Sequence, residues 1–213
     1  MKKPLIKLLC TFSILINISI IVAVFIIFIF STGIKNDIYM LIAKRAGETK
    51  IAFIGDSITK GGGIWAFRIE EYNFNVWNFG PSSLPTRQLR YFGNIVANYH
   101  FEYAFVMTGT NDKDKSINGA SISFGYYKEI LDTLREVGTE PIIQLTLNRL
   151  NDSNPEYIET LNKYLKIYAV EYKLTVIDLN PILCPNQSLL PEYSKDGLHL
   201  NETVYNVWSK EII

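Results

Sequence analysis

The chain has 213 residues, of which 48% are hydrophobic, with 21 basic and 21 acidic side chains. Residues 1–35 contain four lysines and no acidic residue, so the rest of the chain carries 17 basic against 21 acidic side chains, a net charge of −4. An acidic domain without a basic run is a poor candidate for binding nucleic acid. The 3 Trp, 13 Tyr and 12 Phe residues exclude intrinsic disorder. The roughly 180 residues that follow the N-terminal region suit one domain.

The N-terminal region predicts a membrane anchor. Residues 8–30 (LLCTFSILINISIIVAVFIIFIF) contain no charge, and a helix of this length can cross the ~30 Å hydrocarbon core of a bilayer. The lysines within residues 1–7 predict a cytoplasmic N-terminus and a periplasmic or extracellular domain. A cleaved signal peptide is the alternative, because Ser31 and Gly33 resemble a cleavage site, and it would make the protein secreted. The apolar run exceeds the ~7–15 residues of the apolar h-region of a signal peptide, which favours the anchor.

The remaining chain divides into a short stalk and one globular domain. We expect residues 31–48 to form the stalk and residues 49–213 the domain. Cys10 and Cys184 lie in different regions, so no disulfide is expected within the chain. No cluster of cysteine and histidine suggests a metal site, and neither a metal nor another cofactor is expected.

Alternating apolar patterns predict an α/β domain. Short apolar runs that read as buried strands cover residues 50–55, 74–80, 103–109, 141–146 and 174–179. Between them lie helical stripes, one at Tyr127, Ile130, Leu131 and Leu134 before Gly138, one at Ile158, Leu161, Leu165, Tyr168 and Tyr172 after Asn154-Pro155, and a closing helix over 202–213. This alternation predicts a parallel sheet with helices on both faces.

Polar segments follow the predicted strands, where the active sites of parallel sheets form. They are Gly55-Asp56-Ser57-Ile58-Thr59, Asn78-Phe79-Gly80, Gly109-Thr110-Asn111-Asp112 and, near the C-terminus, Asp196-Gly197-Leu198-His199-Leu200-Asn201. Each alone has an ordinary structural explanation: Ser57 and Asn111 as helix caps, Gly80 as a turn residue, His199 as a surface histidine. Their combination at one expected edge of the sheet points to a shared site.

These four segments resemble the consensus blocks of the SGNH (GDSL-type) hydrolase family, in its order and at similar spacing, over residues 50–210. The resemblance implies a three-layer α/β/α, flavodoxin-like sheet of five parallel strands and esterase activity. It implies Ser57 as nucleophile, His199 as base and Asp196 as the acid of a catalytic triad. It also implies an oxyanion hole formed by Ser57, Gly80 and Asn111.

Two residues depart from the family pattern. Ser83 stands where many members have a second glycine, and Val204 stands where a glycine often precedes the tyrosine matched here by Tyr205. Neither belongs to the implied triad, so the departures bear on substrate shape more than on catalysis.

The chemistry of these residue types agrees with the implied roles. A serine hydroxyl needs a base to take its proton, and an imidazole needs an acceptor that fixes its tautomer. Asp196 and His199 are three residues apart, so one turn can bring them into contact. Backbone N–H groups of Ser57 and Gly80 and the side-chain amide of Asn111 can supply oxyanion donors. We expect Asp56 and Asp112, in contrast, to anchor the local backbone.

Two other catalytic motifs are excluded. The G-x-S-x-G elbow of α/β-hydrolases is absent because Thr59 stands at its second glycine. A phosphate-binding loop would need glycine at position 60, where the chain has Lys60.

The function expected from the sequence is a membrane-anchored, metal-independent serine esterase with a small-molecule, glycan or lipid ester as substrate. Short acyl groups such as O-acetyl on an envelope glycan are expected, because a long acyl chain needs an apolar channel or a lid. The predicted connections are mostly short, and only residues 112–120 and 180–195 are long enough to wall the crevice. An O-acyltransferase, and a lysophospholipase or thioesterase, are alternatives. The alternative that is not an enzyme is a non-catalytic binding module with the same fold. The sequence does not identify protein partners.

Overall fold

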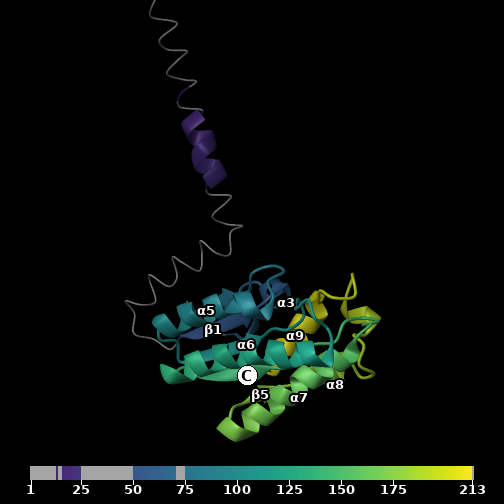
Figure 1. Cartoon of the computed structure of the whole chain (residues 1–213). Helices are drawn as coiled ribbons and strands as arrows, with labels where there is room; N and C mark the ends of the chain where they lie inside the picture. Colours follow the sequence, from purple (N-terminus) through teal and green to yellow (C-terminus); the bar gives the residue numbers. More distant parts are fainter. Residues whose placement is uncertain (1–12, 14–15, 25–49, 71–74, 213) are drawn as a thin grey trace, which may run out of the picture. The chain divides into compact units, whose positions relative to one another are not determined.

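The computed structural model describes residues 13, 16–24, 50–70 and 75–212 (Figure 1). The chain divides into two units, Met1–Ile38 and Tyr39–Ile213. In the first unit residues 16–24 are helical. None of the described helices combines the length and the apolar character that a membrane span requires. Most of the predicted span 8–30 and all of the predicted stalk 31–48 lie outside the described residues, so the anchor stays a prediction.

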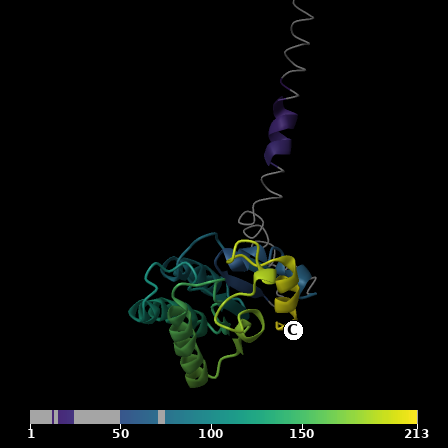
Figure 2. The same cartoon turned by 90° about the vertical axis from the view of Figure 1, so that its right-hand side faces the viewer.

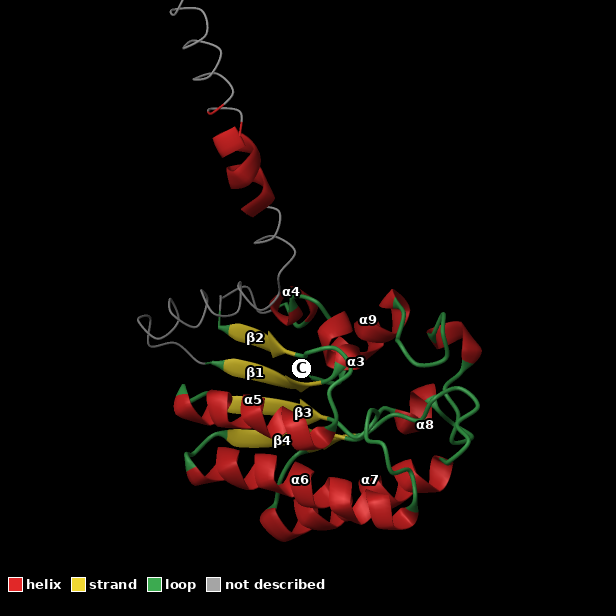
Figure 3. Cartoon of the chain, turned by 45° about the horizontal axis from the view of Figure 1, so that its top comes forward, coloured by secondary structure: helices red, strands yellow, loops and turns green. Residues whose placement is uncertain are grey.

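The second unit is built on one sheet of five parallel strands in the order β2-β1-β3-β4-β5 (Figure 3). The strands are β1 (Ile51–Gly55), β2 (Val76–Phe79), β3 (Tyr103–Met107), β4 (Glu140–Gln144) and β5 (Val176–Ile177). This order is that of flavodoxin-like folds, and all five strands were expected from the sequence. The strands are shorter than predicted, and β5 has two residues instead of six.

Helices cover both faces of the sheet, as the alternating pattern predicted. One face packs against the long helices α5 (Thr86–Asn98), α6 (Ile117–Glu136) and α7 (Pro155–Tyr172). The other face packs against α3 (Ser57–Gly61), α4 (Trp65–Arg68), α8 (Asn180–Leu183) and α9 (Glu202–Lys210), and a 3-10 turn spans Pro191–Tyr193. Alternate residues of β1 serve the two cores: Ala52 and Ile54 face the first, and Phe53 the second.

Helix ends follow local sequence signals. Helix α6 ends at Glu136, and Gly138 just beyond it adopts φ +82°, a conformation that suits glycine. Helix α7 begins with Pro155, whose missing N–H is not needed at this position. Helix α5 was not expected, although its buried Leu89 and Val96 are spaced for one helical face.

An aromatic cluster on the second face fixes the elements that carry the polar segments. The Trp65 ring stacks on Phe53 of β1 at a centroid distance of 4.3 Å and meets Trp208 of α9 edge-on at 4.9 Å. Both tryptophans are fully buried. Burial of such rings is worth several kcal/mol, so helices α3, α4 and α9 are held rigidly against the strand that leads to Ser57.

Candidate active site

Ser57 lies where β1 turns into α3. It is the first residue of α3, so its backbone N–H has no acceptor within the helix. Asp56 caps the helix: its carboxylate accepts a hydrogen bond from the Ile58 N–H at 2.9 Å. Asp56 is 1% exposed, and burial raises its pKa to about 6. The expectation that Asp56 anchors the local backbone agrees with this contact.

Three predicted residues form one hydrogen-bonded chain. The Ser57 hydroxyl lies 3.0 Å from His199 Nε2, and His199 Nδ1 lies 2.6 Å from Asp196 Oδ2. When Nδ1–H donates to the carboxylate, Nε2 is left as an acceptor for the serine hydroxyl. The C-terminal segment thus lies beside the beginning of the domain although 142 residues separate Ser57 from His199. Figure 2 shows this proximity from the side on which the strands end.

A tight turn holds Asp196 against His199. Asp196 Oδ1 accepts hydrogen bonds from the backbone N–H of His199 at 2.7 Å and of Leu198 at 3.0 Å, which leaves Oδ2 for the imidazole. Gly197 allows the turn because its φ is +79°. Hydrogen bonds from the His199 side chain and from these backbone N–H groups hold the Asp196 pKa well below its usual range. The carboxylate therefore stays ionised at neutral pH.

Gly80 lies at the end of β2, beside the turn that carries Ser57. A Cβ at this position would come within 2.4 Å of the Lys60 backbone nitrogen and 2.9 Å of the Asp56 carbonyl oxygen, so only glycine fits. The Gly80 N–H donates to Asn78 Oδ1 at 3.0 Å. The Asn78 amide in turn donates to the Gly63 carbonyl at 2.8 Å and so joins β2 to the segment after α3.

Asn111 follows β3, the neighbour of β1 on its other side. Its side-chain Nδ2 makes a long, weak hydrogen bond of 3.4 Å to the Leu84 carbonyl. The adjacent Asp112 accepts hydrogen bonds from the Thr86 N–H at 2.8 Å, the Thr86 hydroxyl at 2.6 Å and the Tyr157 hydroxyl at 3.0 Å. Asp112 is thus an anchor, as expected. Gly80 and Asn111 follow the strands on either side of β1, but their donors engage other acceptors in this structure.

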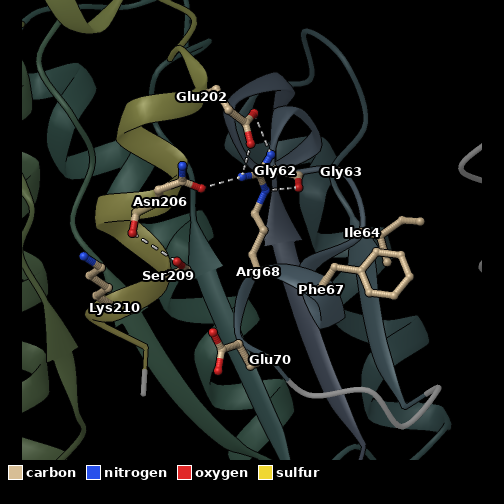
Figure 4. Close-up of a pocket in the computed structure, with 10 residues that line it drawn as sticks. All are labelled: Gly62, Gly63, Ile64, Phe67, Arg68, Glu70, Glu202, Asn206, Ser209 and Lys210. Carbon is tan, nitrogen blue, oxygen red and sulfur yellow. Dashed lines mark hydrogen bonds and ion pairs between the residues drawn. The ribbon is translucent and has the colours of Figure 1, made fainter.

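A second set of contacts braces the His199 segment against α3. The Tyr205 hydroxyl donates to the Ile58 carbonyl at 2.7 Å. Arg68 makes a two-pronged ion pair with Glu202, at 2.8 and 3.0 Å, and also donates to the Gly62 carbonyl and to Asn206 (Figure 4). The cavity drawn there contains none of the predicted site residues. Its polar groups position α9 relative to α3.

The two departures from the family pattern have different structural consequences. Ser83 adopts φ +60°, in the left-handed region that favours glycine. Val204 is fully buried in α9, within the second core. Among the described residues, no hydrogen bond joins either of them to Ser57, His199 or Asp196.

Sequence reasoning missed several residues that shape the site. Asn78 accepts a hydrogen bond from the Gly80 N–H, a role that its place in the Asn78-Phe79-Gly80 segment did not predict. Lys115 and Arg149 were not singled out, yet both side chains donate to the Thr110 carbonyl, next to Asn111. Their meeting joins residues 34 positions apart. The only signal in the sequence was that each is a basic residue in the connection after a predicted strand, Lys115 after β3 and Arg149 after β4.

A serine, a histidine and a carboxylate in one hydrogen-bonded chain, at the edge where parallel strands end, define the class of serine hydrolases. The model of the GDSL-like lipase/acylhydrolase family matches residues 53–207. The chain therefore belongs to this family, and the resemblance seen in the sequence is confirmed. No curated protein matches the chain.

Solved structures share the fold. A GDSL-like lipase from Bacteroides thetaiotaomicron is 18% identical, with a TM-score of 0.68 over 84% of this chain and 95% of that one. A lipase/acylhydrolase from Enterococcus faecalis is 19% identical, with a TM-score of 0.59 over 78% and 93%. An acetyl xylan esterase is 16% identical, with a TM-score of 0.63 over 76% and 97%. At these identities the likeness shows a common fold.

Proposed function

We propose that the protein is an esterase in which Ser57 is the nucleophile, His199 the general base and Asp196 the residue that orients and stabilises the imidazole. The observation that carries this proposal is the continuous chain from the Ser57 hydroxyl through His199 to the Asp196 carboxylate, at 3.0 and 2.6 Å. The 3.0 Å distance lies in the range needed for proton transfer from the Ser57 hydroxyl to His199 Nε2, and the 2.6 Å contact lets Asp196 orient the imidazole.

The reaction proceeds by acyl transfer through the serine. As Ser57 Oγ forms a bond to the ester carbonyl carbon, its proton moves to His199 Nε2. When the tetrahedral intermediate collapses, the bond to the alcohol oxygen breaks and Nε2 gives this oxygen the proton. Water then attacks the acyl carbon and gives a proton to Nε2. When the second tetrahedral intermediate collapses, the bond between the acyl carbon and Ser57 Oγ breaks, Nε2 returns the proton to Oγ, and the carboxylic acid leaves. Asp196 stays ionised throughout and stabilises the imidazolium.

Donors on both sides of Ser57 stabilise the oxyanion. We assign this role to the backbone N–H groups of Ser57 and Gly80 and to the Asn111 side-chain amide. Gly80 and Asn111 each exchange an internal acceptor, Asn78 Oδ1 or the Leu84 carbonyl, for the developing negative charge. A charged acceptor forms the stronger hydrogen bond, so the exchange favours the transition state.

Short acyl groups are the proposed substrates, in particular O-acetyl on an envelope glycan. A long chain needs an apolar channel, and two of the four large aliphatic residues of segment 180–195 belong to the core: Leu183 and Leu189 are 0% and 1% exposed, whereas Ile182 is exposed and Leu190 is partly buried. In segment 112–120 the single large apolar residue is Ile117, among polar neighbours. The fold shared with an acetyl xylan esterase supports the same choice.

A series of p-nitrophenyl esters from acetate to palmitate tests this proposal. We expect kcat/KM of the full chain to be highest at acetate or propionate, and Ser57→Ala to abolish hydrolysis of every ester. A maximum at eight carbons or beyond would instead indicate a lysophospholipase or thioesterase. Adding an alcohol acceptor separates the hydrolase from an O-acyltransferase, because a transferase yields the acylated alcohol in place of the free acid.

We also propose that residues 8–30 anchor the domain outside the cytoplasm. The support is the uncharged 23-residue run and the lysines before it. We expect the full chain to sediment with membranes and to be cleaved by protease added from the outer face. A mature chain that starts at Ile34 would contradict the anchor and indicate secretion.

A further inference from the structure

Two cations meet at one backbone oxygen beside Asn111. Lys115 Nζ donates to the carbonyl oxygens of Gly109 at 3.0 Å and Thr110 at 2.9 Å. Arg149 Nη2 donates to the same Thr110 oxygen at 2.5 Å. Thr110 directly precedes Asn111, so both positive charges lie next to the proposed oxyanion hole.

The backbone around Arg149 places it against the His199 segment. The Arg149 carbonyl accepts a hydrogen bond from the Leu189 N–H at 3.2 Å, and the Leu150 N–H donates to the Gly197 carbonyl at 2.8 Å, within the turn between Asp196 and His199. The Arg149 side chain thus reaches from the His199 turn to the loop that carries Asn111. Its charge also acts to lower the pKa of Asp56, the residue before Ser57.

Lys115 is held close to this arginine at an energetic cost. Its ammonium lies 4.3 Å from the centre of the Tyr157 ring and is partly withdrawn from solvent. Burial, followed by the nearby Arg149 guanidinium, lowers the pKa of Lys115 to about 8. A lysine with a lowered pKa that contacts the residue before Asn111 is a candidate functional group.

Neither cation has an ion-pair partner in the part of the chain that the structure describes. The ion-paired lysines and arginines there are Arg68, Arg90, Lys128, Arg135 and Lys166. Asp112, Asp152 and Asp56 act on Lys115 only from beyond the 4.0 Å limit of an ion pair. A guanidinium has five N–H donors, and the Thr110 carbonyl engages one nitrogen of Arg149. The pair therefore retains both charge and donors for a ligand.

We propose that Lys115 and Arg149 form an anion-binding subsite, and that the ester cleaved at Ser57 carries a carboxylate or phosphate group near its reacting carbonyl. This inference rests on the proposed esterase function and narrows its substrate to acidic esters, such as an acylated acidic glycan. A bound anion offsets the repulsion between the two cations and accepts their remaining hydrogen bonds. Charge-assisted hydrogen bonds of this kind are worth about tenfold or more in binding.

Two pairs of esters test the subsite with the full chain. Mono-p-nitrophenyl succinate against p-nitrophenyl acetate places the charge on the acyl side, and 4-acetoxybenzoate against its methyl ester places it on the alcohol side. Each kcat/KM is divided by the rate of hydrolysis of that ester by hydroxide. We expect the charged member of at least one pair to be preferred by about tenfold or more, and the preference to fall as ionic strength rises.

Variants identify the residues responsible for the preference. Lys115→Gln and Arg149→Gln should each lower the charged-to-neutral ratio by about tenfold, while Arg149→Lys keeps more of it. Lys113→Gln is the matched control, because Lys113 is exposed, lies two residues from Lys115 and loses the same charge. If these residues had only a structural role, the substitutions would lower kcat/KM equally for both esters of a pair and leave the charged-to-neutral ratio unchanged.

Inorganic phosphate provides a second readout that does not depend on hydrolysis. It should raise the Tm of the wild type and of Lys113→Gln more than that of Arg149→Gln. Absence of a charge preference in both pairs, or a preference and a phosphate effect that survive in Lys115→Gln and Arg149→Gln, would overturn the subsite. Failure of the wild type to hydrolyse any of the four esters, with the phosphate effect intact, would contradict the proposed function and leave the subsite supported.

Discussion

The buried carboxylate of Asp56 makes stability depend on pH in a way that one substitution isolates. Its pKa is raised from 3.8 to about 6, chiefly by burial. Between about pH 4 and 6 the unfolded chain loses the Asp56 proton while the folded chain keeps it, so the free energy of unfolding falls as pH rises. A shift of about two pKa units corresponds to about 3 kcal/mol, lost in full once pH exceeds the folded pKa.

Asp56→Asn removes this titration and keeps an oxygen that can accept the Ile58 N–H. The difference in unfolding free energy, variant minus wild type, should therefore increase by about 3 kcal/mol between pH 4 and pH 7.5. Urea unfolding followed by tryptophan fluorescence measures it, since all three tryptophans are buried. A difference that is constant with pH, or that decreases, would refute the reasoning.

Asp114→Asn is a control with the opposite sign. Hydrogen bonds to Ser116 lower the pKa of the exposed Asp114 carboxylate. Its contribution to stability is therefore present above the unfolded pKa and lost as pH falls. The difference in unfolding free energy, variant minus wild type, should therefore be more negative at pH 7.5 than at pH 3.

Three further substitutions test the site and its supports. Asn111→Ala should lower kcat by ~10²–10³-fold with a smaller effect on KM; steady-state kinetics that show only a raised KM would make Asn111 a ground-state binding residue. Ser83→Gly should raise the free energy of unfolding by about 0.5–1 kcal/mol because it relieves the left-handed φ of +60°, whereas Ser82→Gly, at a residue without positive φ, should not. Tyr205→Phe should lower it by about 1–2 kcal/mol in urea unfolding, because the buried Ile58 carbonyl loses its donor; an unchanged midpoint would show that this brace contributes nothing.

Much of the site could be predicted because its residues follow strands directly. Ser57, Gly80 and Asn111 each lie within four residues of a strand end, and parallel strands bring those ends to one edge. Asp196 and His199 were predictable as a pair because a single turn joins them. These are local relations, which sequence patterns record well.

Contacts between loops were not predictable in the same way. Lys115 and Arg149 meet because the loops after β3 and β4 fold over the same carbonyl oxygen, and no periodic pattern specifies loop geometry. The prediction for β5 was too long, with six residues against the two observed, because an apolar run indicates burial but not the extent of strand pairing. Helix α5 was not predicted because Thr86 and Gly93 occupy positions on its buried face, where an apolar stripe would have large apolar residues.

Covalent labelling of the full chain with a fluorophosphonate tests the central claim most directly. The probe phosphonylates only a serine that a neighbouring base activates. Mass spectrometry of proteolytic peptides should place the adduct on Ser57 in the wild type, and labelling should be lost in Ser57→Ala and strongly reduced in His199→Ala. No adduct on Ser57 in the folded wild type, or labelling that persists in Ser57→Ala, would contradict the account.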